Sequence, residues 1–237
     1  METKLSSYYS HVFNLRKGNK LTQTQVSIAT LILAGYTGRD PKMVEQHISE
    51  LEAIGISRPS ATPSFYWTPK RLLTTANRIK VKGEHTSGEV EPVLIYLPDG
   101  WYLGVGSDHT DRELETQNIT LSKQVCPKVI GSELWHIDSV IDHWDKLILR
   151  SYLINNSEQY LYQESALSAI QKPEYILERY IEQGKNLPEG FTIFLGTVPV
   201  IGKVMGAEGF AIKLFDPILN QTIKHQYHVE MGVLQSC

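Results

Sequence analysis

The spacing of hydrophobic and polar positions changes along the chain, and each spacing predicts a different element. Residues 23–34 alternate at first and then become continuously apolar, which is typical of a buried strand. A glycine-containing turn follows, and Asp40 with Pro41 then predicts a helix start, because aspartate caps helices and proline fits the first helical position. We expect this helix to run over about 41–54 and to end at Gly55.

The middle of the chain carries a strong hairpin signal. Residues 89–97 and 101–108 are strand-like and flank the turn sequence Pro98-Asp99-Gly100. Prolines between residues 56 and 75 favour an extended or looped segment there. Further along we expect a short helix and a strand over 133–153, an amphipathic helix over 163–184, and β segments over 191–200, 210–219 and 222–231.

These elements predict a β-rich α+β protein with a few helices. Its 237 residues fit one large domain, or one domain with a small appendage. We divide it into a small N-terminal strand and helix portion (1–75), which includes a possible lid, and a main β domain (76–237). The two portions are expected to pack as one compact unit.

Charge and composition exclude several classes of partner. The chain has 23 basic and 26 acidic residues with no basic patch, which argues against nucleic acid. Apolar runs such as residues 28–34 are too short to span a membrane, and the N-terminus shows no secretion signal. Cys126 and Cys237 are most simply free thiols, so we expect a cytoplasmic protein.

Acidic residues collect on the predicted hairpin. Glu89 and Glu91 are two positions apart, so both side chains should lie on one face of their strand. Asp108 ends the partner strand. Such carboxylates repel one another unless they are solvated or share a cation. The pattern therefore leaves two interpretations open: a solvated strand face, or a site for a hard ion such as Mg²⁺ or Mn²⁺, with Ca²⁺ as a further possibility.

The acidic hairpin resembles the fumarylacetoacetate hydrolase superfamily. In that superfamily an E-x-E strand is followed by a motif close to N-D-x-S-A-R-D-x-Q, which residues 107–115 resemble. Three further blocks occur in the expected order: His47-x-x-Glu50 before a proline-rich segment, the lysine of LSKQVCP, and FTIFLGTVPVIG, which is similar to a G-T-P-x-G motif. The resemblance covers roughly residues 30–230. It indicates an uncharacterised branch, a family of unknown function marked by G-S-D-H-T-D-R.

This resemblance implies a mixed β-roll or sandwich of the fumarylacetoacetase type, a homodimer, and a set of site residues. It implies that Glu89, Glu91 and Asp108 hold the metal ion. It also implies that Arg112 braces the site or the substrate, while Glu115 stands where relatives have a glutamine that helps to recognise the substrate. The match to G-T-P-x-G adds Gly196 and Thr197 as substrate-binding residues. Independently of the resemblance, Arg39, just before the predicted helix, is a candidate carboxylate clamp for the substrate.

The expected catalytic residues are His47, Glu50 and Lys123. The first two lie one helical turn apart and would form a dyad that activates water, although the same spacing also suits an incidental pair on a helix surface. Lys123 would stabilise an enolate or bind a carboxylate, or else is a solvated lysine.

By this resemblance the chain is a metal-dependent enzyme that acts on a 2-oxo acid or an acylpyruvate-like substrate through an enolate. Hydrolysis of a C–C bond is the first choice, and decarboxylation, isomerisation and hydration stay open. A second hypothesis is a catalytically silent protein that binds the metal and a small carboxylate. A third is a metal-free hydrolase that uses Cys126 with His136 or His143, although no nucleophile motif surrounds that cysteine.

Overall fold

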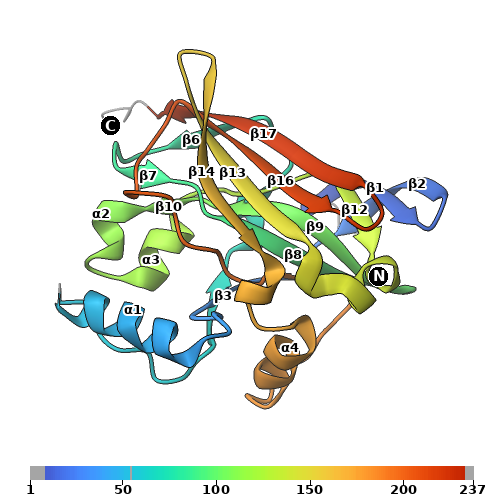
Figure 1. The fold of residues 1–237 in the computed structure, drawn as a ribbon, viewed down its shortest axis with the longest axis horizontal. Helices are drawn as coiled ribbons and strands as arrows, with labels where there is room; N and C mark the ends of the chain where they lie inside the picture. Colours follow the sequence, from blue (N-terminus) through green and yellow to red (C-terminus); the bar gives the residue numbers. More distant parts are fainter. Residues whose placement is uncertain (1–8, 54, 233–237) are drawn as a thin grey trace, which may run out of the picture.

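The computed structural model describes residues 9–53 and 55–232, and Cys237 lies outside this range. Among these residues, ten strands form one mixed sheet (Figure 1). Its main path runs β2 (Lys20–Ser27), β1 (Ser10–Lys17), β12 (Glu133–His136), β9 (Gly100–Asp108), β8 (Val90–Leu97), β15 (Phe191–Phe194), β3 (Thr30–Gly35) and β4 (Ser64–Thr68). Two short strands, β11 (Lys128–Ile130) and β5 (Leu73–Thr74), extend it beside β9.

A second sheet, in which most strand pairs are antiparallel, packs against the first. Its order is β14 (Glu158–Ala166), β13 (Ile148–Asn155), β16 (Gly209–Asp216), β17 (Gln221–Met231) and β6 (Arg78–Val81). The main core lies between the two sheets, where Val90 and Leu94 of β8 pack with Leu149 of β13 and Ile212 of β16. A separate pair, β7 (Thr86–Ser87) and β10 (Thr110–Asp111), lies at the margin.

Strand alternation separates the two faces of β8. Val90 and Leu94 point to the second sheet, whereas Val93 and Ile95 belong to a different apolar cluster on the opposite face. Because side chains alternate with a period of two, the odd-numbered Glu91 shares the face of Val93 and Ile95. The face of the sheet that is turned away from the second sheet therefore carries the acidic residues.

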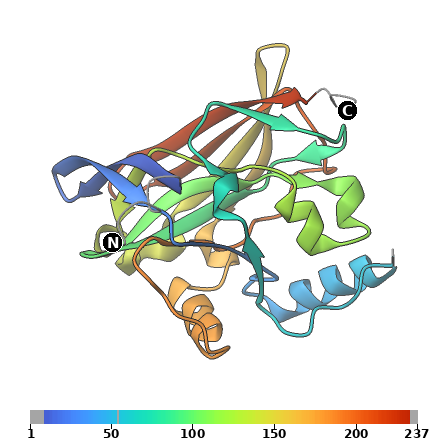
Figure 2. The ribbon, with the colours of Figure 1, turned by 180° about the vertical axis from the view of Figure 1, so that it is seen from behind.

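The helices lie outside the sheets. α1 (Pro41–Ala53), α2 (Arg112–Glu115) and α3 (Ile119–Gln124) lie at one end of the molecule, opposite the β1–β2 hairpin (Figures 1 and 2). The backbone amide of Lys42 donates to Asp40 Oδ1 at 2.9 Å, so Asp40 caps α1 as the sequence predicts. α4 (Pro173–Ile181) packs on the main core, and short 3₁₀ turns cover Lys70–Leu72, Ile137–Ser139, Ile141–Lys146 and Leu167–Ala169. Within the described ranges, no helix is both long enough and apolar enough to cross a bilayer.

The β-rich α+β fold and the central hairpin are confirmed, but some boundaries are wrong. The predicted strand over 23–34 is two strands, because the amides of Ile28 and Ala29 bond to Tyr9 and Gly190 instead of continuing one ladder. The helix predicted over 163–184 is limited to Pro173–Ile181. Its first residues continue β14, whose register with β13 extends to Ala166.

Residues of the N-terminal portion belong to the large sheet. β3 pairs in parallel with β15, and β4 continues the sheet beside β3. Segments from both halves of the chain thus share one hydrogen-bonded layer. The division at residue 75 and the lid stay predictions.

Candidate metal centre

The three acidic residues converge at the end of the hairpin away from its turn. Glu89 directly precedes β8, and its carbonyl accepts a 2.9 Å hydrogen bond from the amide of Asp108. Glu91 lies opposite Gly106 in the antiparallel register. One carboxylate oxygen from each acid lies within 4.8 Å of the others, and Glu91 and Asp108 are buried. A packed sheet therefore holds three acids together with little access to bulk water.

Two buried lysines neutralise Asp108. Lys123 Nζ lies 2.5 Å from Asp108 Oδ2, and Lys128 Nζ lies 2.6 Å from Asp108 Oδ1. Lys128 also donates to the carbonyl of His109 at 2.6 Å. Burial opposes ionisation of Asp108, but the two ammonium groups outweigh it and hold the pKa of this carboxyl below its usual range. Burial likewise opposes the charge on Lys123, but Asp108 and Glu89 raise the pKa of its ammonium group.

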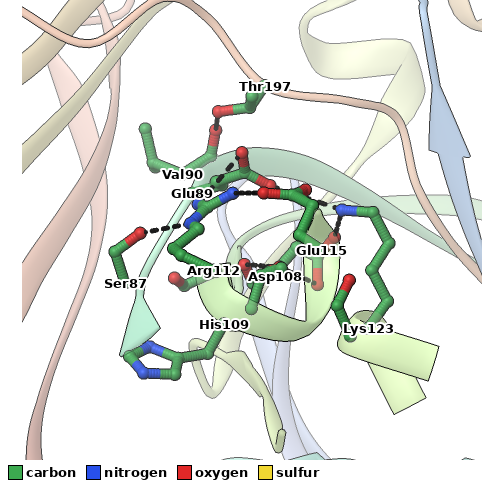
Figure 3. A network of polar contacts seen from close by, with 12 residues as sticks. Ser87, Glu89, Val90, Asp108, His109, Arg112, Glu115, Lys123 and Thr197 are labelled. Carbon is green, nitrogen blue, oxygen red and sulfur yellow. Dashed lines mark hydrogen bonds and ion pairs between the residues drawn. The ribbon is translucent and has the colours of Figure 1, made fainter. Parts of the chain in front are cut away.

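Arg112 organises the outer part of the site (Figure 3). Its guanidinium lies 3.1 Å from Glu89 Oε1 and 2.8 Å from Glu115 Oε2, and its Nε donates to Ser87 Oγ at 2.6 Å. Lys123 Nζ adds a 3.4 Å contact to Glu89 Oε2. Burial would raise the pKa of Glu89, but Arg112 and then Lys123 lower it. Glu89 is therefore an ionised carboxylate fixed from two sides.

Glu91 has a different environment. Its Oε2 accepts a 2.8 Å hydrogen bond from the amide of Gly196, and no ion pair to Glu91 occurs within the part of the chain that the structure describes. Burial, followed by the charge of Asp108, raises the pKa of Glu91 well above its ordinary range. Gly196 has φ +97°, and a Cβ there would lie 1.9 Å from Thr37 Oγ1, so only glycine brings its amide to Glu91.

The predicted substrate-binding residue Thr197 has structural partners. Its hydroxyl donates to the carbonyl of Val90 at 2.9 Å and accepts from Gln163 Nε2 at 2.9 Å. Gln163 Oε1 accepts from the amide of Val90 at 3.1 Å and from Ser151 Oγ at 2.8 Å. This buried network ties the segment after β15 to the start of β8. It thus fixes Gly196 relative to Glu91.

The predicted dyad is not assembled. His47 and Glu50 are both exposed on α1, and Glu50 Oε1 accepts from Gln46 Nε2 at 2.9 Å. Within the described residues, no hydrogen bond joins His47 to Glu50, and the His47 ring lies 6.0 Å from the Tyr36 ring, measured between centroids. Arg39 forms a two-pronged pair with Asp145, each contact 2.7 Å, and also donates to the carbonyl of Ile170.

Two other buried groups, His109 and the sequence candidate Cys126, have packing roles. His109 is buried between Thr86 and Tyr227, at 2.9 and 3.1 Å, and burial lowers the pKa of its imidazole to about 3. Cys126 is buried, and burial raises the pKa of its thiol to about 11, which opposes a role as a thiolate nucleophile.

Two residues of the site were not predicted from the sequence. Lys128 forms an ion pair with Asp108, and Gln163 forms hydrogen bonds with Val90 and Thr197. The signal for Lys128 was a lysine that directly precedes apolar Val129 and Ile130 in a short strand, an arrangement that calls for a buried partner. Gln163 gave no local signal, because its partners are far away in the sequence.

The donor set suits a hard divalent cation. Three carboxylates offer oxygen ligands, which Mg²⁺, Mn²⁺ and Ca²⁺ prefer, and no thiol or imidazole joins the described group. Glu91 forms no ion pair with a described residue, and this carboxyl group would release its proton on binding an ion. The residues present therefore fit such an ion.

Comparison with known proteins gives a consistent picture. A family described as "Protein of unknown function (DUF2848)" matches residues 34–227. No curated protein matches the chain. Among solved structures, fumarylpyruvate hydrolase from Pseudomonas aeruginosa in complex with Mn²⁺ and pyruvate is similar, with a TM-score of 0.63 and 13% identity over 93% of this chain and 97% of that one.

Two further structures show the same likeness. A candidate fumarylacetoacetate isomerase/hydrolase from Oleispira antarctica has a TM-score of 0.66 and 14% identity, over 91% of this chain and 99% of that one. 2-Keto-3-deoxy-D-arabinonate dehydratase complexed with magnesium and 2,5-dioxopentanoate has a TM-score of 0.63 and 14% identity, over 90% and 77%. At these identities the likeness shows the fold.

Proposed function

The chain belongs to the family of unknown function DUF2848 and has the fold of fumarylacetoacetate hydrolase proteins, and from this we propose that it is a divalent-metal-dependent enzyme acting on a 2-oxo acid. Within that class we propose hydrolysis of a C–C bond in an acylpyruvate-like substrate. The similar structures of a hydrolase with Mn²⁺ and pyruvate and of a dehydratase with magnesium support the broader class. Decarboxylation, isomerisation and hydration are the neighbouring reactions.

The observation that carries this proposal is the unequal charge balance among the three acids. Lys123, Lys128 and Arg112 pair with Asp108 and Glu89, whereas Glu91 is buried beside them with an amide as its partner. A purely structural cluster would not need a third acid that resists ionisation. Glu89, Glu91 and Asp108 would hold Mg²⁺ or Mn²⁺, with Ca²⁺ as a third candidate.

The bound ion would act as a Lewis acid that polarises the keto oxygen of the 2-oxo acid and stabilises an enolate. Lys123 stays an ammonium group, so it can donate to a developing oxyanion and cannot serve as the base. Arg112 fixes Glu89, and the Gly196 amide orients Glu91. In hydrolysis, water attacks the distal carbonyl, the C–C bond breaks, its electron pair forms the enolate, and the enolate takes a proton at C3.

The base that activates water is proposed to be His47 with Glu50, after their side chains rotate into contact and α1 moves toward the acids. A second candidate function, a silent binding protein, is supported by the contacts of this structure, in which Glu50 bonds to Gln46 and no hydrogen bond to His47 occurs among the described residues. Exchange of the C3 protons of pyruvate with solvent deuterium distinguishes the two functions. It requires enolisation, so an enzyme should catalyse it with Mg²⁺ present and a binding protein should not.

Oxalate provides a direct test of the metal centre, because it chelates hard ions and mimics the planar enolate of pyruvate. Calorimetry should show oxalate binding with Mg²⁺ or Mn²⁺ and at least tenfold weaker binding in EDTA. Glu91→Gln should abolish the difference, while Glu113→Gln, the same substitution at an exposed position of α2, should keep it. Equal oxalate affinity with metal and with EDTA would exclude binding through a chelated ion.

A further inference from the structure

Lys128 is a buried lysine to which the proposed reaction assigns no step. Its Nζ lies 2.6 Å from Asp108 Oδ1 and 2.6 Å from the carbonyl oxygen of His109, and its side chain is fully buried. β11 pairs with β9 so that Lys128 and Asp108 are direct neighbours across the two strands. Both partners accept hydrogen bonds, so the amino group donates to each. A second lysine is thus built into the sheet directly beside a proposed metal ligand.

The two lysines at Asp108 have different neighbours. Lys123 Nζ lies 2.5 Å from Asp108 Oδ2 and 3.4 Å from Glu89 Oε2, so it is shared by two of the acids (Figure 3). Lys128 contacts the other oxygen of Asp108, and among the described residues it forms no ion pair with a further acid. An ion shared by the acids would compete with Lys123 for their oxygens and would leave the contact of Lys128 in place.

A purely structural role does not call for a charge at Lys128. Asp108 already has Lys123 as a counterion, and the carbonyl of His109 needs only a neutral donor. Burial lowers the pKa of the Lys128 ammonium group, and the charge of Asp108 opposes this shift only in part. The fold therefore holds a positive charge at a place where burial disfavours it, and such groups are common at functional sites.

We propose that Lys128 tunes the charge of the metal centre: it weakens the binding of the divalent ion to the acids and strengthens the binding of an anionic ligand to the loaded centre. A fixed positive charge nearby repels a cation and attracts an anion, and burial limits the screening of both effects. An ion that Asp108 holds less firmly also keeps more of its charge for the oxygens of the ligand. This inference rests on the proposed function, because it takes Glu89, Glu91 and Asp108 as the metal ligands.

Two affinities measured by calorimetry test this role: that of Mn²⁺ for the metal-free protein, and that of oxalate for the Mn²⁺-loaded protein. Lys128→Met keeps an unbranched side chain of similar length and removes its charge. It should bind Mn²⁺ about tenfold more tightly than the parent and oxalate about tenfold more weakly, because the removed charge acts on the two ligands with opposite sign. Lys128→Arg keeps a positive charge and should stay closer to the parent in both affinities. Lys80→Met, which removes the charge of an exposed lysine of β6, should leave both unchanged.

A residue that only shapes the site would give a different pattern, because its loss should weaken the binding of Mn²⁺ and of oxalate together. Parallel losses or unchanged affinities in Lys128→Met would overturn the inference, while binding of metal and oxalate to the parent would still support the proposed function. If the parent itself binds no Mn²⁺ or Mg²⁺, the proposed function is wrong.

Urea unfolding in EDTA shows whether the neutral variants fold. Lys128→Gln is measured beside Lys128→Met, because its amide can still donate to a neighbouring acceptor and so leaves fewer buried groups without a partner. Opposite shifts of the two affinities in either folded variant support the inference. If neither neutral variant folds, the charge of Lys128 serves the fold and the inference is overturned.

Discussion

At the scale of single residues, Glu91 and Asp108 differ in what the protein supplies to them. Both are buried, yet Asp108 contacts two ammonium groups while Glu91 contacts a backbone amide. The pKa of Asp108 is therefore lowered and that of Glu91 is raised. The same substitution of acid by amide should consequently have opposite effects at the two positions.

Asp108→Asn should destabilise the metal-free protein by about 3–5 kcal/mol, because it leaves Lys123 and Lys128 buried without their shared counterion. Glu91→Gln should leave the free energy of unfolding unchanged or raise it, because glutamine can still accept from Gly196 and adds no charge beside Asp108. Urea unfolding in EDTA measures both. Equal losses in the two variants would contradict the charge assignment.

The pH dependence of Glu91 follows from the direction of its pKa shift. Its folded-state pKa lies above the ordinary 4.5, so its contribution to stability is present below that pH and is lost as the pH rises through the folded pKa. In EDTA, the unfolding free energy of Glu91→Gln relative to the parent should therefore increase as the pH rises above about 4.5. Urea titrations at several pH values measure this difference in unfolding free energy.

Some of the site residues are predictable from the sequence, and the rest depend on distant contacts. Period-two spacing and the hairpin turn suffice to bring Glu89, Glu91 and Asp108 together. The amide of Gly196 reaches Glu91 across 105 positions of sequence, and no local pattern encodes that approach. The ion pair between Arg39 and Asp145, which are 106 positions apart in the sequence, cannot be predicted for the same reason.

At the scale of elements, α1 is weakly anchored to the rest of the molecule. Ile48 is the only buried residue among the described positions of this helix, whereas every residue of β8 except Tyr96 is buried. Elements with few buried contacts open more readily than core strands. A lid role for α1 is therefore physically possible, while β8 and β9 act as the rigid support for the acids.

Hydrogen exchange tests this difference between elements. Amides of α1 should exchange faster than those of β8 and β9 in the metal-free protein, and Mg²⁺ with oxalate should slow exchange in α1 if the helix closes over the ligand. Amides of α4, on another part of the core, provide the internal control. Unchanged exchange in α1 at saturating oxalate would exclude closure of this helix.

His47→Ala tests the catalytic part of the same hypothesis. It should lower kcat by a factor on the order of 10²–10⁴ on a turned-over 2-oxo acid while metal and oxalate binding stay unchanged. Glu50→Gln should have a milder effect, because Glu50 would orient the imidazole. Full turnover in both variants would make α1 a scaffold and leave the base to be found among groups closer to the acids.

The contrast between correctly and wrongly predicted elements has a physical cause. The β8–β9 hairpin is local, and its turn chemistry fixes its register, so the sequence is sufficient. The segment at 163–172 has amphipathic spacing, yet pairing with β13 keeps its first residues in β14 as far as Ala166. A 3₁₀ turn over Leu167–Ala169 follows, and α4 begins only at Pro173. Tertiary pairing thus overrides a local preference where a neighbouring strand is available.

At the scale of the whole molecule, the acids lie at a junction of distant segments. β8 and β9 supply Glu91 and Asp108, α3 and β11 supply the two lysines, and the segment after β15 supplies Gly196. An ion bound there would join β8 to β9 directly, and the Gly196 amide connects Glu91 to the segment after β15. Metal binding should therefore stabilise the global fold and not only a loop.

Mg²⁺ or Mn²⁺ should raise the free energy of unfolding by an amount set by mass action, about 2.7 kcal/mol when free metal is 100 times its dissociation constant. The melting temperature measured against metal concentration should rise without a plateau above saturation of the site, and EDTA should reverse it. Glu89→Gln, Glu91→Gln and Asp108→Asn should each abolish the rise, whereas Glu113→Gln should preserve it, because that exposed carboxylate lies outside the cluster. The metal-induced increase in the free energy of unfolding should also become smaller as the pH falls, since protons compete with the ion for Glu91. If all three cluster variants respond to metal like the parent, the ion binds elsewhere and the acids at the end of the hairpin serve only the charge network of Lys123, Lys128 and Arg112.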